Sequence, residues 1–170
     1  MNGLRRLLYL GLSLCWACSP ATEKTRVVDW GRVPVSIELR LAQGSSAPGL
    51  RPARVYGTAD TVYLHSEAEL SNDHIARAEA VETRIGKGLI LQVWHTKAGA
   101  RRMADLTSNH IGDSLAVLID SVVVAVPMIQ QTLNPGTRQS SDIGVPLEPK
   151  EARQLALAVS KTWPGGGSGK

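Results

Sequence analysis

The chain has 170 residues, of which 43% are hydrophobic and 4% aromatic, and its formal net charge is +4. This length suits one domain that can bury a sufficient core. Arg5 and Arg6 belong to a segment that we expect to be removed, which leaves 17 basic against 15 acidic side chains. Such a balance excludes a strongly basic surface of the kind that binds nucleic acid.

Residues 1–17 read as a signal peptide, with the two arginines preceding an apolar run at residues 7–17. That run is too short to span a bilayer, which takes about 20 apolar residues. Cys18 follows the small residue Ala17, which predicts that Cys18 is acylated as the first residue of a lipoprotein. Two alternatives stay open, namely lipidation at Cys15 and an uncleaved or ordinarily cleaved signal. We therefore expect a domain tethered to a membrane on its extracytoplasmic side, and Ser19 in place of aspartate makes the outer membrane a secondary expectation.

Both cysteines lie in the targeting segment, so the rest of the chain has no thiol for a disulfide or a metal. We expect a tether at residues 18–32, a folded domain at residues 33–163 and a disordered glycine-rich tail at residues 164–170.

The first half of this domain shows mainly strand patterns. Val35, Ile37, Leu39 and Leu41 alternate with polar residues, which predicts a half-buried strand within 33–41. A loop at 42–52 and a strand at 61–64 are predicted next. One or two helical turns follow at 72–78, capped by Ser71 or Asn72. Two strands, 80–85 and 89–95, are then expected around a turn at Gly86–Gly88.

The second half carries two amphipathic helices and a hairpin. Apolar spacing predicts a helix over 97–109, capped by Thr96, with Ala100, Met103, Ala104, Thr107 and Ile111 on one face. Strands at 115–119 and 122–126 flank Asp120-Ser121, a two-residue turn that requires positive φ. Pro149 in the first turn and Lys161 near the end mark a second helix over 149–161, with a core face at Ala152, Leu155, Ala156 and Val159.

Residues 97–134 resemble the periplasmic head module of the SecD/SecF family, accessory subunits of bacterial protein export. The family's pattern is a Gly-Ala helix start, a Leu-Thr pair, an Asp-Gly hairpin and an Ala-Pro-x-Ile segment. The matching residues here are Gly99-Ala100, Leu106-Thr107, Asn109, Gly112, Leu115-Ala116, Asp120, Ala125, Pro127 and Ile129, followed by Gly136, Glu151-Ala152 and Leu155-Ala156. The likeness covers roughly residues 61–160. Ser121 departs from the usual glycine of the hairpin.

The order of elements predicts an α+β fold with one mostly antiparallel sheet and both helices, 97–109 and 149–161, packed on one face. The resemblance implies a head that engages unfolded polypeptide, with Asp120, Ser121, Pro127 and Ile129 as candidate contacts on the hairpin. The strand within 33–41 is a second candidate, as an exposed edge that accepts an extended chain. In that family, a proton-driven motion depends on membrane helices and on acidic residues within them. We see neither in this sequence outside the predicted signal, so we do not expect this chain to use a proton gradient by itself.

No pattern for chemistry accompanies these features. His65, His74, His95 and His110 have no metal-binding spacing, and Ser66, Ser71 and Ser140-Ser141 lack a nucleophile elbow. Gly86-Lys87-Gly88 is too short for a phosphate loop. We therefore expect a non-catalytic module without a cofactor or a metal, whose partners are polypeptide clients or envelope and export proteins. The alternatives are an assembly partner of an envelope complex and a small-ligand binder.

Overall fold

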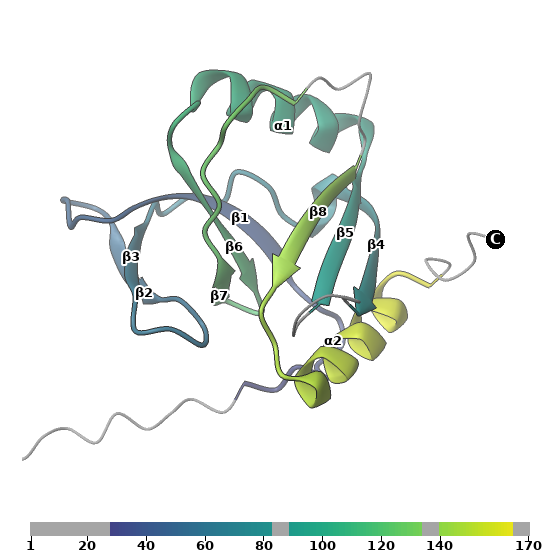
Figure 1. The fold of residues 1–170 in the computed structure, drawn as a ribbon. Helices are drawn as coiled ribbons and strands as arrows, with labels where there is room; N and C mark the ends of the chain where they lie inside the picture. The colour runs from purple at the N-terminus through teal and green to yellow at the C-terminus, as the bar shows by residue number, and fades with distance from the viewer. Residues whose placement is uncertain (1–27, 83–88, 134–139, 165–170) are drawn as a thin grey trace, which may run out of the picture.

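A computed structural model describes residues 28–82, 89–133 and 140–164. Within these ranges the chain forms two antiparallel sheets, ordered β2-β3-β1-β6-β7 and β4-β5-β8, and two α-helices (Figure 1). The elements are β1 (Ile37–Gln43), β2 (Arg51–Arg54), β3 (Thr61–Leu64), the single 3-10 turn η1 (Asn72–His74), β4 (Ile75–Glu82), β5 (Leu89–His95), α1 (Lys97–Asn109), β6 (Ser114–Ile119), β7 (Val122–Ala125), β8 (Ser140–Val145) and α2 (Pro149–Thr162).

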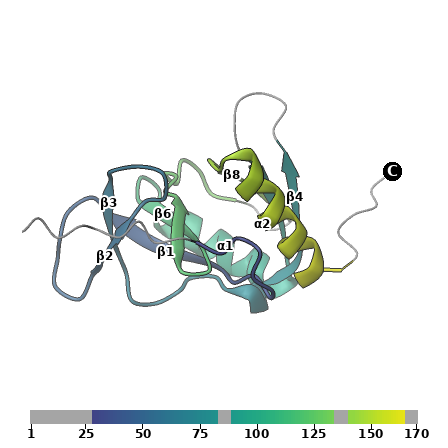
Figure 2. The same ribbon diagram turned by 90° about the horizontal axis from the view of Figure 1, so that it is seen from below.

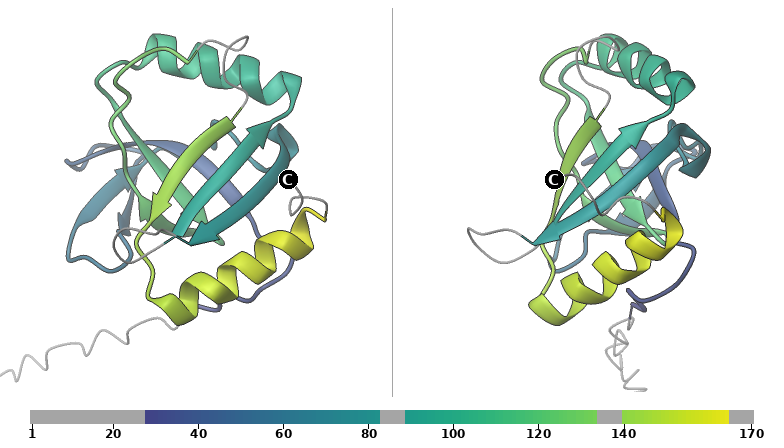
Figure 3. Two further views of the ribbon diagram at one scale, coloured as in Figure 1. Left: turned by 45° about the vertical axis from the view of Figure 1, so that its right-hand side comes forward. Right: turned by 90° about the vertical axis from the view of Figure 1, so that its right-hand side faces the viewer.

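The predicted α+β class, with antiparallel strands and two helices, is confirmed. The strands form two sheets where one was expected, because α1 lies between β5 and β6 and delivers β6 next to β1. The helices lie at opposite ends of the two sheets and not on one face, with α1 at the top and α2 at the bottom in Figure 3. The main core fills the space between the sheets and draws on both helices, as Leu91, Val117, Met103 and Leu155 show.

The hairpin is present as predicted, with Ile119 paired to Val122 across a two-residue turn. Asp120 and Ser121 both have positive φ, at 47° and 67°. Two consecutive left-handed residues are the mark of a type I′ turn, whose twist matches that of the flanking strands. The side chain of Asp120 also accepts a hydrogen bond of 2.8 Å from the amide of Ser36, which ties the turn to the start of β1.

Both helices begin as predicted. Thr96 caps α1, accepting a 3.0 Å hydrogen bond from the amide of Gly99, and Pro149 opens α2. The first helix buries Leu106 in place of Ile111, which is 59% exposed. The reason is that α1 ends at Asn109, so Ile111 lies outside the helical face that its spacing suggested.

Gly99, in the first turn of α1, lies where a side chain does not fit. A Cβ atom at this position would lie 2.2 Å from the carbonyl oxygen of His74. The helix start therefore packs directly on the backbone of η1, and any side chain at Gly99 would push the two apart.

Three predicted segments differ from the structure. Only Asn72–His74 is helical within 72–78, because Ile75 already pairs with His95 as the start of β4. The predicted loop at 42–52 is shortened at both ends by β1 and β2. The predicted tether at 18–32 ends earlier than expected, because Trp30 is 1% exposed and belongs to the main core.

Several predictions lie outside the described residues, among them the signal peptide at 1–17, both cysteines, the Gly86–Gly88 turn, Gly136 and the tail beyond Pro164. No helix in the described ranges is long and apolar enough to cross a membrane.

Candidate functional site: a groove on the five-stranded sheet

The five-stranded sheet buries residues on both of its faces. Strand β6 sends Leu115, Val117 and Ile119 into the main core, whereas Ala116 and Leu118 join a second cluster on the opposite face. The other buried members of this second cluster are Ala42, Leu64 and Val123. Because β6 is buried on both faces, the five-stranded sheet must curl so that its own strands cover the face turned away from the main core.

The curl brings the two edge strands of this sheet together. Val55, directly after β2, forms a parallel bridge with Val123 of β7, and the amide of Tyr56 donates a 2.8 Å hydrogen bond to the carbonyl of Val123. Figure 2 shows β2 and β3 at the side of the molecule that lies away from β4 and α2. The two edges of the sheet are therefore joined at Val55 and Val123.

A groove of about 750 Å³ opens where the edges have not closed. Its walls come from β1, β2, β6, β7 and the loop after β2, and they include Ala53, Val55, Leu118 and Val123 as apolar surface. Arg51, Arg54 and Thr58 are exposed at its margins. The groove therefore combines an apolar floor with a polar rim, an arrangement typical of binding sites.

Two charged residues of β1 lie in the groove wall, facing away from the main core. Glu38 and Arg40 form an ion pair in which the Arg40 Nη2 atom lies 2.7 Å from the Glu38 Oε2 atom, and Arg40 also donates to the backbone carbonyl of Ser66. Their side chains are only 27% and 14% exposed. The pair is thus held in one geometry, and the two arginines of β2 add further cationic side chains to the lining.

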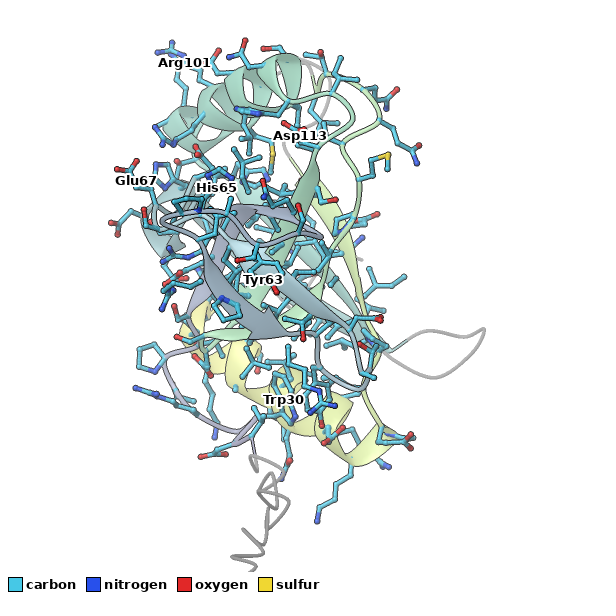
Figure 4. The ribbon with its side chains drawn as sticks, turned by 90° about the vertical axis from the view of Figure 1, so that its left-hand side faces the viewer. Trp30, Tyr63, His65, Glu67, Arg101 and Asp113 are labelled. Atoms are coloured by element: carbon cyan, nitrogen blue, oxygen red, sulfur yellow. The ribbon has the colours of Figure 1, made fainter. Side chains whose placement is uncertain are left out.

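The loop after β2 is fixed to the second helix. The ring of Tyr56 packs edge-on against Trp30 with 5.0 Å between ring centroids, and its hydroxyl donates to the carboxylate of Glu151. Burial raises the pKa of Tyr56, and the hydrogen bond to Glu151 adds to the rise, so the phenol keeps its proton and remains a donor. Figure 4 places Trp30 beside α2, at the end of the molecule opposite Arg101.

The predicted hairpin contacts do not form one cluster. Asp120 and Ser121 lie at the tip, and Ser121 is exposed at the groove. Pro127 and Ile129 lie at the far end of the strands, where the amide of Leu115 donates to Pro127. Pro127 is exposed, whereas Ile129 is 6% exposed and packs in the main core. The predicted exposed edge at 33–41 is also wrong, because β6 pairs along residues 37–42 on one side and Leu70 bridges Leu39 on the other.

His74 and His95 lie close enough to interact, whereas His65 follows β3 and His110 follows α1. His95 is buried, its Nε2 atom lies 3.1 Å from the Ser141 hydroxyl, and burial followed by the charge of His74 lowers its pKa. His74 belongs to the η1 cap with Ser71, and His110 contacts Asp113. Among the described residues, no three His, Cys, Asp or Glu side chains gather as a metal site would require.

Sequence patterns missed the groove because it depends on the pairing of β2 and on the contact of Val55 with Val123, and both join segments remote in sequence. The strand β2, RPAR, contains a proline and two arginines and has weak strand propensity by itself. The one available signal was that residues 115–119 are apolar without alternation, which indicates a strand buried on both faces.

Comparisons with known proteins agree with this architecture. Residues 51–162 match the family described as SecDF, P1 head subdomain. The chain is 34% identical over 96 residues to protein translocase subunit SecD of Mycobacterium tuberculosis (strain ATCC 25618 / H37Rv), covering 56% of this chain and 17% of that protein. It is 25% identical over 129 residues to the SecD subunit of Magnetococcus marinus, covering 76% and 23%. The chain thus spans about a fifth of the length of the curated relatives it matches.

Two solved structures share the fold. The crystal structure of SecDF in its super-membrane-facing form superposes with a TM-score of 0.56 at 20% identity, over 77% of this chain and 19% of that one. A structure of a membrane component SecDF that enhances protein export superposes with a TM-score of 0.54 at 19% identity, over 77% and 64%. With a family match across residues 51–162, more than half of the sequence, the chain belongs to the SecDF P1 head subdomain family.

Proposed function

We propose that this protein is a non-catalytic, extracytoplasmic module that serves protein export by contacting extended polypeptide in the groove of its five-stranded sheet. The observation that carries the proposal is the groove itself, in a chain whose family belongs to a protein translocase. Related proteins carry the names protein translocase subunit SecD and a membrane component SecDF that enhances protein export.

The shape and chemistry of the groove suit an extended chain better than a compact ligand. Two of its sides are the edge strands β2 and β7, which are joined through a bridge between Val55, just after β2, and Val123. Pro52 has no N–H to offer along β2, so contact with the apolar walls contributes more than the addition of a strand. The apolar part of the wall, from Ala53, Val55, Leu118 and Val123, can contact side chains without demanding one sequence, and the Glu38–Arg40 pair lies beside it.

We further propose that the domain is anchored through acylated Cys18 after removal of residues 1–17. This proposal rests on the sequence alone, with the arginine pair, the short apolar run and the small residue Ala17 as its support. Two or three acyl chains anchor a protein stably, whereas one chain gives only marginal binding. The position proposed for the domain is the periplasmic side of a membrane.

The proposal is tested by filling the groove. Ala53→Trp places an indole between β2 and β7, and Ala76→Trp, at an exposed position of β4, serves as the matched control. A labelled unfolded polypeptide should bind the parent and the control with a Kd near micromolar, about −8 kcal/mol. The groove variant should lose most of this binding while keeping its melting temperature. Equal binding by all three proteins would exclude the groove as the contact.

A second candidate, docking to a partner of an envelope complex, has its own observation. Ile111 and Met128 are 59% and 60% exposed, and the neighbouring Pro127 is also exposed. The amide of Gly112 donates to the carbonyl of Ile129, which holds the two segments side by side. Saturable binding to one native envelope protein, lost in Met128→Asp and absent for unfolded chains, would favour this candidate.

A further inference from the structure

The second helix presents a basic stripe to solvent. Lys150, Arg153, Leu157 and Lys161 are spaced by three, four and four residues, which places all four on one side of the helix. All four are exposed, and Leu157 is 62% exposed. We call these four residues the α2 stripe.

The buried residues of α2, among them Ala152, Leu155 and Val159, lie on the opposite side of the helix and pack in the main core. The acid within the helix, Glu151, is outside the stripe and accepts the hydrogen bond from Tyr56. The stripe therefore combines three cations with one apolar side chain and contains no acid. This composition matches the outer face of a helix that rests on an anionic bilayer.

The chain enters the domain at this same end. Trp30 contacts Tyr56, the partner of Glu151 in the first turn of α2, and the amide of Val35 donates a 2.9 Å hydrogen bond to the Thr162 hydroxyl in the last turn. The segment between them therefore follows α2 along its length (Figures 1 and 3). It adds the exposed Arg32 and Val33, of which Val33 is 47% exposed.

The length of chain before the domain limits its distance from the anchor. Ten residues lead from Cys18 to Val28, the first described residue, and ten residues reach at most about 36 Å. A domain held so close meets the membrane surface at a high effective concentration, so even weak contacts are populated. The described part of the chain begins at the end that carries α2.

The opposite end lacks this charge pattern. Around α1, Arg102 pairs with Glu69, and Asp105 accompanies Arg101 on the helix. Arg101 points outward at the top of the molecule in Figure 4. Its charge and exposure make it a suitable control for a cation of the α2 stripe.

We infer that the α2 stripe docks on the surface of a bilayer containing anionic phospholipid, and so orients the domain with α2 against the membrane and α1 away from it. This inference rests on the anchoring proposed above. It assigns the domain a second membrane contact besides the acylated Cys18, and this contact sets the orientation of the domain. The β2–β3 side, and with it the groove, stays accessible to clients.

The test is acylation of lysines in the full chain reconstituted into vesicles, with mass spectrometry reading each site. Lys150 and Lys161 report on the stripe, and Lys97 on α1 is the internal control. In vesicles of phosphatidylglycerol and phosphatidylcholine, both stripe lysines should react about fivefold more slowly than in pure phosphatidylcholine, because anionic lipid attracts clustered cations. Lys97 should react equally in both, and high salt should restore the stripe lysines.

Charge reversal separates the stripe from general electrostatics. Arg153→Glu should abolish the protection of Lys150 and Lys161, whereas Arg101→Glu should leave it unchanged. Equal reactivity of all three lysines in both kinds of vesicle would overturn the inference. Protection that persists in detergent and grows with protein concentration would also overturn it and assign the stripe to a second copy of the chain. Failure of the chain to stay with vesicles of either kind would instead contradict the anchoring.

Discussion

The hydroxyl of Tyr56 donates a hydrogen bond to the carboxylate of Glu151, a residue 95 positions later in the chain. The same carboxylate, through its Oε2 atom, accepts a 3.1 Å hydrogen bond from the amide of Glu148 and so forms part of the cap of α2. One acid therefore fixes both the start of the helix and the loop that borders the groove.

Tyr56→Phe should destabilise the fold by about 1.5–3 kcal/mol, the usual contribution of a hydrogen bond to a charged group. Because the pKa of Tyr56 is raised, the folded state holds the phenolic proton more tightly than the unfolded state. The stability of the parent should therefore be complete below pH 10 and decline above it, and the variant should lose this decline. Urea unfolding between pH 7 and pH 11 measures both effects, and an unchanged alkaline slope in Tyr56→Phe would contradict the assignment.

Gly99→Ala should destabilise the protein by about 1–3 kcal/mol, although alanine is the better helix former by about 1 kcal/mol. The added Cβ atom would lie 2.2 Å from the His74 carbonyl oxygen, so α1 must move off η1. Gly44→Ala is the control, because no atom lies within 4 Å of its Cβ position. Thermal unfolding should show a lower melting temperature for the first variant alone.

Ser121→Gly should stabilise the hairpin by about 0.5 kcal/mol. Relief of a left-handed non-glycine residue is worth about 1–2 kcal/mol, and the greater freedom of glycine in the unfolded chain offsets part of that. The φ of 67° at Ser121 is the observation behind this prediction. Ser121→Ala removes the hydroxyl but keeps the backbone strain, so it should leave the urea midpoint close to that of the parent. A glycine variant less stable than the alanine variant would count against the turn geometry.

His95 should make the fold sensitive to mild acid. Burial, and then the positive charge of His74, lowers its pKa from the ordinary value of 6.5. The unfolded state therefore binds the proton first as pH falls, so the stability that is complete above pH 6.5 should decrease below it. In His95→Gln the melting temperature should depend less on pH between pH 7 and pH 5, even if the substitution shifts the melting temperature itself. His65→Gln, at an exposed position, should retain the slope of the parent.

Cys18→Ser should release the chain from membranes or leave an unprocessed precursor, since it removes the proposed acylation site. Fractionation of cells, followed by electrophoresis of the membrane and soluble material, measures both outcomes. Cys15→Ser is the matched control and should behave like the parent. The reverse result would move the lipid to Cys15, and no effect of either change would exclude lipidation.

Sequence patterns determined those elements whose signals are local. Thr96 and Pro149 mark the helix starts because capping and a fixed φ act within one turn. Asp120-Ser121 marks the hairpin because its flanking residues are apolar and the turn holds two residues. Val124 of this hairpin is 1% exposed and packs in the main core. The same local patterns, together with the family likeness, were sufficient for the α+β class.

Tertiary structure alone decided how these elements are shared between two sheets. Strand β8 contains Asp142 and Gly144, residues that disfavour strands, and it is a strand because β5 offers it a paired edge. Ile75 leaves its helical turn because His95 is across from it, and Trp30 is buried because Tyr56 provides a face for its ring. The groove depends on the meeting of Val55 with Val123, residues distant in sequence. Such contacts follow from burial and backbone pairing between remote segments, and no local pattern encodes those interactions.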